Sequence, residues 1–144
     1  MKQTIMLATV CLLLSDVAYA GEQYLCTADI ASGFWFNKSS KEWEHTTFKA
    51  NSKYVISKPD DGSSAFVVRE IGRDFQNAWC KDTFNEAGFL FCEGIGGDFK
   101  FNRKNGRFIS AHLFGYFNVV PGVNEITDTT SDTPYLEIGK CSPF

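Results

Sequence analysis

Short runs in which apolar and polar residues alternate follow one another over most of the chain after residue 20. Successive side chains of a β-strand point to opposite faces, so this alternation predicts half-buried strands. The predicted strands are Gln23–Ile30, 34–36, Trp43–Phe48, Lys53–Ser57, Ala65–Ile71, Asn77–Cys80, Phe89–Cys92, Asp98–Asn102, Arg107–Leu113 and Tyr135–Lys140. No strong amphipathic helical pattern appears in this region. The pattern therefore predicts an all-β domain, a small antiparallel barrel or sandwich of about eight strands.

The dipeptide Asn105-Gly106 predicts a hairpin. A two-residue loop would place Phe101 opposite Ser110, whereas a three-residue loop ending at Gly106 would place Phe101 opposite Ile109. Directly opposed residues share one face of a sheet, so the longer loop keeps apolar residues together. We therefore expect the three-residue loop, with Gly106 in the left-handed region.

The first twenty residues have the pattern of a secretory signal peptide. Lys2 gives a positive start, residues 4–14 are almost wholly apolar, and Ala18-Tyr19-Ala20 offers small residues for cleavage after Ala20. The apolar stretch is shorter than the ~20 residues that span a bilayer, and no second such stretch follows. We expect a signal peptide at residues 1–20, a single β domain at residues 21–144 and no membrane span.

Removal of the signal would take away Cys11 and leave four cysteines. An even number in a short exported chain indicates disulfides, although four cysteines allow three pairings. We predict Cys80–Cys92, which brackets a turn-forming segment, and Cys26–Cys141, which would join the first and last strands. The latter pairing would close the sheet and favour a barrel. No Cys-x-x-Cys pair occurs and the histidines are distant in sequence, so we expect no metal site and no cofactor.

Charge and composition narrow the classes of partner. The formal net charge is -3, and acidic and basic residues are scattered without a basic block. A nucleic-acid footprint needs a concentrated basic face, and membrane-surface segments are polybasic, so both are disfavoured. Aromatic residues make up 15% of the chain, which predicts a phenylalanine-rich β core.

The same aromatic content offers candidate binding residues, because Trp and Tyr concentrate binding energy at interfaces. The candidates are Trp35, Trp43, Trp79 and Tyr116. The long polar connection from Val119 to Asp132 is a further candidate, because long connections in small domains are often functional or disordered.

Nothing in the chain forms a catalytic motif. A nucleophile needs a base within hydrogen-bond reach, and the only histidines in the sequence are His45 and His112. No serine lies in a Gly-x-Ser-x-Gly elbow, and Gly94–Gly97 is not followed by the Lys-Ser/Thr of a phosphate loop. We assign no catalytic residue. An enzyme would require His45 or His112 to face a cleft beside a carboxylate.

Three stretches carry a resemblance: residues 24–29 leading to Gly33-Phe34, Phe48 with residues 53–56, and residues 132–141. Together they resemble a group of small, uncharacterised exported proteins of proteobacteria, which implies a periplasmic or secreted protein of a Gram-negative bacterium. In size, disulfide-linked β-barrel style and signal peptide, the chain is also similar to periplasmic lysozyme inhibitors, although it lacks their Ser-Gly-x-x-Tyr inhibitory loop.

These observations predict an exported, non-enzymatic binding module that recognises an unknown protein partner, with an inhibitor as one concrete version. The alternative is a lipocalin-like carrier of a small apolar ligand. A carrier requires an interior too roomy for its own side chains to fill, since small eight-stranded barrels either fill their interior or hold one ligand. An interaction module requires aromatic residues or a mobile loop on the outside.

Overall fold

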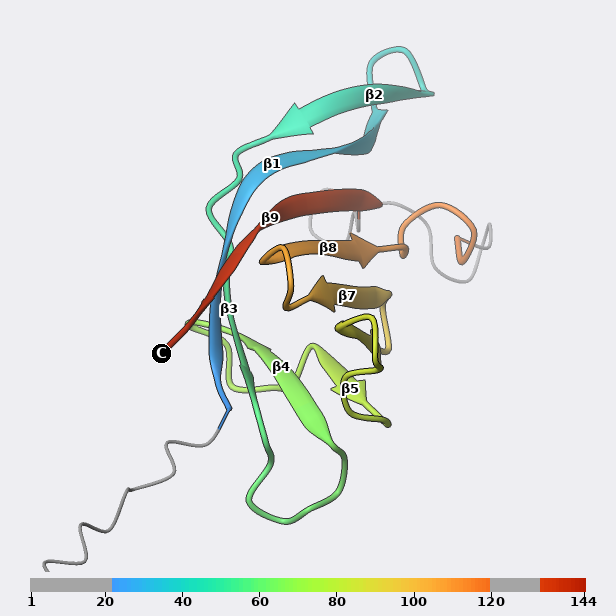
Figure 1. Ribbon diagram of the computed structural model, residues 1–144. Helices are drawn as coiled ribbons and strands as arrows, with labels where there is room; N and C mark the ends of the chain where they lie inside the picture. The colour runs from blue at the N-terminus through green and yellow to red at the C-terminus, as the bar shows by residue number, and fades with distance from the viewer. Residues whose placement is uncertain (1–21, 120–132) are drawn as a thin grey trace, which may run out of the picture.

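The computed structural model describes residues 22–119 and 133–144, which form nine β-strands and no helix (Figure 1). The strands are β1 (Tyr24–Asn37), β2 (Glu42–Phe48), β3 (Lys53–Ser57), β4 (Phe66–Glu70), β5 (Ala78–Cys80), β6 (Phe89–Glu93), β7 (Asp98–Asn102), β8 (Arg107–His112) and β9 (Tyr135–Pro143). The all-β prediction is confirmed. The predicted signal peptide and most of the long connection before β9 lie outside the described residues.

All strand pairings are antiparallel, and eight of the strands close into a barrel in the order β1-β3-β4-β5-β6-β7-β8-β9, with β9 pairing back to β1. Closure removes the exposed sheet edges of these strands. The fold is therefore a barrel and not a sandwich. Among the described strands, the remaining one, β2, pairs with β1 alone and lies outside the barrel.

Strand β1 is continuous where the sequence pattern predicted two pieces. A bulge between Ala28 and Ile30 shifts its register against β9 and bends the strand. At Gly33 the backbone just before β9 passes very close: a Cβ atom would lie 2.2 Å from the carbonyl oxygen of Pro134. Only glycine therefore fits at this position. Strand β9 begins at Tyr135, opposite Gly33, so beyond this point β1 continues past the barrel wall in its pairing with β2. We call this two-stranded extension (residues 34–48) the arm.

Both predicted disulfides are present. Cys26 and Cys141 are directly opposed on β1 and β9, and Cys80 and Cys92 link β5 to β6. All four cysteines are buried. Such disulfides form and persist in oxidising environments, which indicates a compartment outside the cytoplasm. Within the described residues, no helix is long and apolar enough to cross a membrane.

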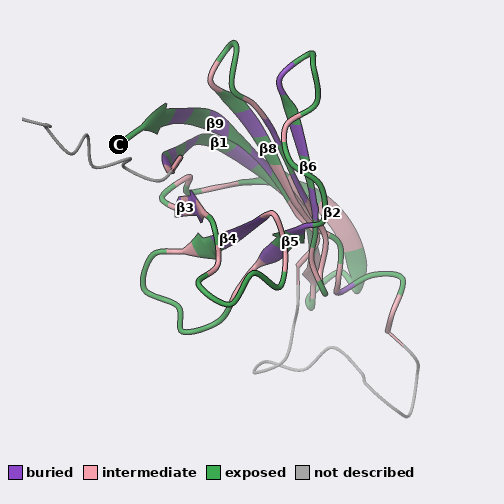
Figure 2. Cartoon of the chain, turned by 60° about the horizontal axis from the view of Figure 1, so that its bottom comes forward, coloured by how far each residue is buried: buried purple, intermediate pink, exposed green. Residues whose placement is uncertain are grey.

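Aromatic side chains pack in the barrel interior. Burial alternates along the strands (Figure 2). Phe99 stacks on Phe108 with ring centroids 5.0 Å apart, and Tyr54 makes edge contacts with both rings. The other large buried side chains are Tyr24, Ile56, Phe66, Leu90 and Phe101. Phenylalanine is the most frequent large side chain in this core, as predicted.

The predicted register of the β7–β8 hairpin was wrong. Phe101 pairs with Phe108, not with Ile109, across a four-residue loop. This register places the phenylalanines inside the barrel and Ile109 on its outer face, and burying large aromatic rings contributes more than burying one isoleucine. Gly106 has φ +67°, in the left-handed region as predicted, and the Asn102 carbonyl accepts its backbone N–H at 2.9 Å.

Candidate functional site

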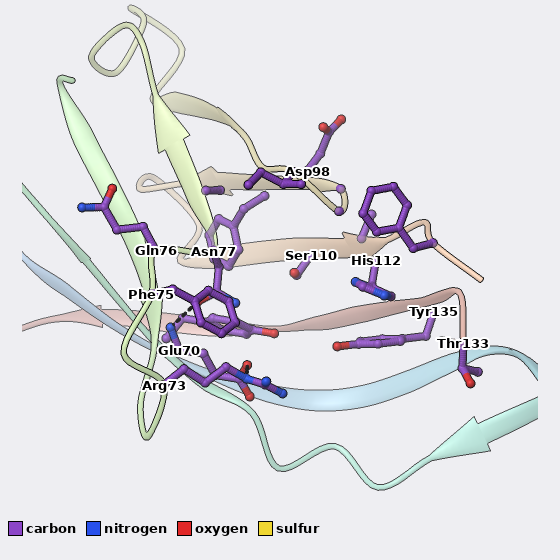
Figure 3. A pocket seen from close by; sticks show the side chains of 18 residues that line it. Glu70, Arg73, Phe75, Gln76, Asn77, Asp98, Ser110, His112, Thr133 and Tyr135 are labelled. Carbon is purple, nitrogen blue, oxygen red and sulfur yellow. Dashed lines mark hydrogen bonds and ion pairs between the residues drawn. The ribbon is translucent and has the colours of Figure 1, made fainter. Parts of the chain in front are cut away.

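One end of the barrel has an open cleft of about 440 Å³ (Figure 3). Its wall comes from the β4–β5 and β6–β7 connections, the end of β8 and the start of β9. Its residues include Glu70, Arg73, Phe75, Ser110, His112 and Tyr135. Tyr135 pairs with Gly33 on β1, immediately before the arm. The cleft and the base of the arm are therefore neighbours.

A network of polar side chains shapes the wall between β4 and β5. The Arg73 guanidinium donates through Nε to Glu70 Oε2 at 2.6 Å, and Asn77 Oδ1 accepts the backbone N–H of Glu70 at 2.6 Å. The carboxylate of Glu70 raises the pKa of Arg73. Among the described residues, the buried Oε1 atom of Gln76 has no hydrogen-bond partner.

His112 lies in the cleft, whereas His45 lies on β2 opposite Phe34 and is exposed. The His112 ring stacks on Tyr135, its cross-strand neighbour, with centroids 5.4 Å apart. Two carboxylates share the cleft with it: Glu70 is engaged by Arg73, and Asp98 lies 3.7 Å from Lys100 Nζ. The structure thus places His112 in a cleft that also contains Glu70 and Asp98, and the assignment of no catalytic residue stays a prediction.

A buried carboxylate lies behind this cleft. The Tyr54 hydroxyl donates to Glu137 Oε2 at 2.5 Å, and the Ser52 hydroxyl donates to Glu137 Oε1 at 2.8 Å. Burial and the nearby carboxylate raise the pKa of Tyr54. Glu137 is the one buried charged side chain among the described residues, and these two donors satisfy both of its oxygens. Tyr54 also lines the cleft, so the buried cluster fixes the cleft wall.

The structure brings together two of the four aromatic candidates. Trp43 and Tyr116 meet with ring centroids 5.3 Å apart, and Trp43 also contacts Phe36 at 5.7 Å. Trp35 is on the arm and 41% exposed. Trp79 is 37% exposed on β5, a barrel strand that neighbours neither β1 nor β2. Three candidates therefore belong to the arm and its contacts, and Trp79 lies apart from them.

The arm also has features that the search for binding residues missed. Within residues 22–119 and 133–144, strand β2 is paired along one edge, so its other edge presents backbone groups that no described strand pairs. Phe34, exposed beside Trp35, was interpreted as part of a strand and not as a binding residue. The signal was present in the sequence as three consecutive aromatic residues, since adjacent strand residues face opposite sides and cannot all enter the core.

The cleft residues between β4 and β5 were also missed, because a polar connection between two short strands has no pattern that distinguishes a cleft wall from an ordinary loop. Among the described residues, no three His, Cys, Asp or Glu side chains lie close enough together to hold a metal ion.

No protein-family model matches this chain, and comparisons with curated proteins and with solved structures also find no significant match. The resemblance to small exported proteobacterial proteins therefore stays a prediction.

Proposed function

We propose that this protein is an exported, non-enzymatic binding module that recognises another protein through its arm. The observation that carries the proposal is the edge of β2 that no described strand covers, on an arm whose other strand, β1, carries the exposed side chains of Phe34 and Trp35. A partner strand added to such an edge gains main-chain hydrogen bonds, and neighbouring side chains provide specificity. Exposed aromatic residues supply the anchors on which interfaces depend.

The position of the arm supports this role. Residues 34–48 extend past the barrel in Figure 1, so a partner strand can approach β2 without displacing a barrel strand. The contact between Trp43 and Tyr116 supports the arm from the connection that follows β8. The disulfides suit an extracytoplasmic compartment, and the resemblance described above favours the periplasm or the exterior of a Gram-negative bacterium.

Site-specific photo-crosslinking tests the proposal. Trp35 and Trp79 are almost equally exposed, at 41% and 37%, so a photoreactive phenylalanine analogue at each position gives a matched pair. In cells that export the protein, we expect discrete protein adducts from position 35 and none from position 79. Removal of the neighbouring aromatic ring by Phe34→Ala should weaken the adducts. Equal adducts from both positions, or none from position 35, would contradict an arm-centred interface.

The carrier remains a second candidate, supported by the cleft. Because aromatic side chains fill the barrel interior, the ligand of such a carrier would bind at the mouth. Native mass spectrometry of the exported protein tests it. An extra small mass that denaturation removes would favour the carrier, and a bare protein would count against it.

A further inference from the structure

The outer wall of the barrel carries three basic side chains in one row that crosses four neighbouring strands. On β1, Thr27 lies between Lys53 of β3 and Lys140 of β9, and Lys140 in turn lies directly opposite Arg107 of β8. All four side chains are exposed. The fold thus collects on one surface three cations that are far apart in the sequence.

These cations are not neutralised within the described part of the chain. The ion pairs formed between described residues do not include Lys53, Lys140 or Arg107. Asp29 is exposed at the bulge of β1, yet it makes none of these pairs. Like charges directly opposite each other on adjacent strands destabilise a sheet. An arrangement that lowers stability is expected where it serves a function. Binding of an external anion between the opposed cations would be such a function.

An apolar row runs beside the basic row, two residues away on β8 and β9 and three residues away on β1, where the bulge adds a residue. Ile30, Ile138 and Ile109 are direct cross-strand neighbours and are 57%, 47% and 39% exposed. Two residues along a strand span about 7 Å, so long basic side chains and branched apolar side chains share one face. This basic–apolar wall (Lys53, Lys140, Arg107, Ile30, Ile138 and Ile109) is independent of the arm and of the cleft.

We propose that the basic–apolar wall binds the surface of an anionic lipid bilayer. Lysine and arginine side chains attract anionic headgroups and extend their charged ends toward them, while neighbouring apolar side chains enter the boundary of the acyl chains. The wall provides both groups, side by side on one surface. Protein interfaces are instead enriched in aromatic residues and depleted of lysine, and the basic–apolar wall contains lysines and isoleucines without an aromatic ring.

Vesicle co-sedimentation tests the proposal with the protein isolated after export and its N-terminus verified by mass. Vesicles of phosphatidylglycerol mixed with phosphatidylcholine should bind the protein at least about tenfold more strongly than phosphatidylcholine alone, because several cations act together. The double variant Lys140→Gln with Arg107→Gln should bind anionic vesicles about 30-fold more weakly, since each cation near such a surface contributes about fivefold. Its stability should not fall, because the opposed like charges are removed.

Lys81→Gln is the matched control. Lys81 is exposed just after β5, the barrel strand farthest from β9 in the closed order, so this change should leave vesicle binding unchanged. Ile138→Ser tests the apolar row and should weaken vesicle binding without changing binding to a soluble polyanion such as heparin.

Three results would overturn the proposal. The first is equal binding to neutral and anionic vesicles, or binding to neither. The second is an effect of Lys81→Gln as large as that of the double variant. The third is tight binding to heparin together with vesicle binding that Ile138→Ser leaves unchanged, which would identify a site for soluble polyanions. An acidic protein partner would appear as lysine-dependent complex formation without vesicle binding.

Discussion

The buried Glu137 is the feature whose energetic role can be tested most sharply. Tyr54→Phe deletes the hydroxyl that donates to Glu137 at 2.5 Å and leaves the Ser52 donor, at 2.8 Å, in place. A hydrogen bond to a charged group contributes about 1.5–3 kcal/mol, and leaving the buried acceptor unpaired adds its desolvation cost. We expect Tyr54→Phe to lower the free energy of unfolding by about 2–3 kcal/mol at neutral pH.

Urea denaturation with both disulfides intact measures this change. Tyr116→Phe is the matched control, because Tyr116 is exposed and surface substitutions usually change stability by less than about 0.5 kcal/mol. In a Glu137→Gln background the lost hydrogen bond is neutral, so Tyr54→Phe should cost only about 1 kcal/mol there. The reasoning is refuted if Tyr54→Phe costs no more than Tyr116→Phe, or if its cost is the same in both backgrounds.

Two further predictions concern stability. The Cys26–Cys141 disulfide spans 115 residues and Cys80–Cys92 spans 12, so in the loop-entropy model replacing each pair by serine should cost about 5 and about 3 kcal/mol respectively. Denaturation curves of the two variants, measured below room temperature, test this order. A larger loss of stability for the Cys80–Cys92 variant would contradict it. Burial and the hydrogen bond donated to Glu22 raise the pKa of Tyr24 to about 12, so its stabilising contribution is complete below about pH 10 and lost between pH 10 and about 12. Ultraviolet titration should show one fewer late-titrating phenol in Tyr24→Phe, and an unchanged curve would exclude this assignment.

Local patterns predicted most of the strands, but they failed where a distant contact decided the outcome. The β7–β8 hairpin contains a clear turn dipeptide, yet the register depended on which side chains the rest of the barrel could bury. Pairing Phe101 with Phe108 completes the aromatic core around Tyr54, and Tyr54 comes from β3. Similarly, the continuity of β1 depends on the close approach of Pro134 to Gly33, which no local window contains.

For the candidate site, too, the sequence indicated some residues, whereas the fold decided how they are grouped. The aromatic residues of the arm were identifiable by type, since Trp and Tyr are common binding residues. Their grouping was not, because Trp43 meets Tyr116 only through the fold. The cleft residues of the β4–β5 connection and the buried Glu137 gave no signal, because a polar residue in a loop or a strand appears exposed until its neighbours are known.

The sequence by itself determined the fold class and indicated an oxidising compartment in which disulfides form. Alternation of period two specifies half-buried strands whatever lies beside them, and four cysteines in a short chain indicate disulfides. Only the tertiary structure decided that the barrel closes and that β2 has an edge uncovered by any described strand. It also decided that Lys53, Lys140 and Arg107 lie on one wall. The physical reason is that strand pairing joins positions far apart in the chain. A charge distribution that is scattered along the sequence can therefore become a concentrated surface once the sheet has closed.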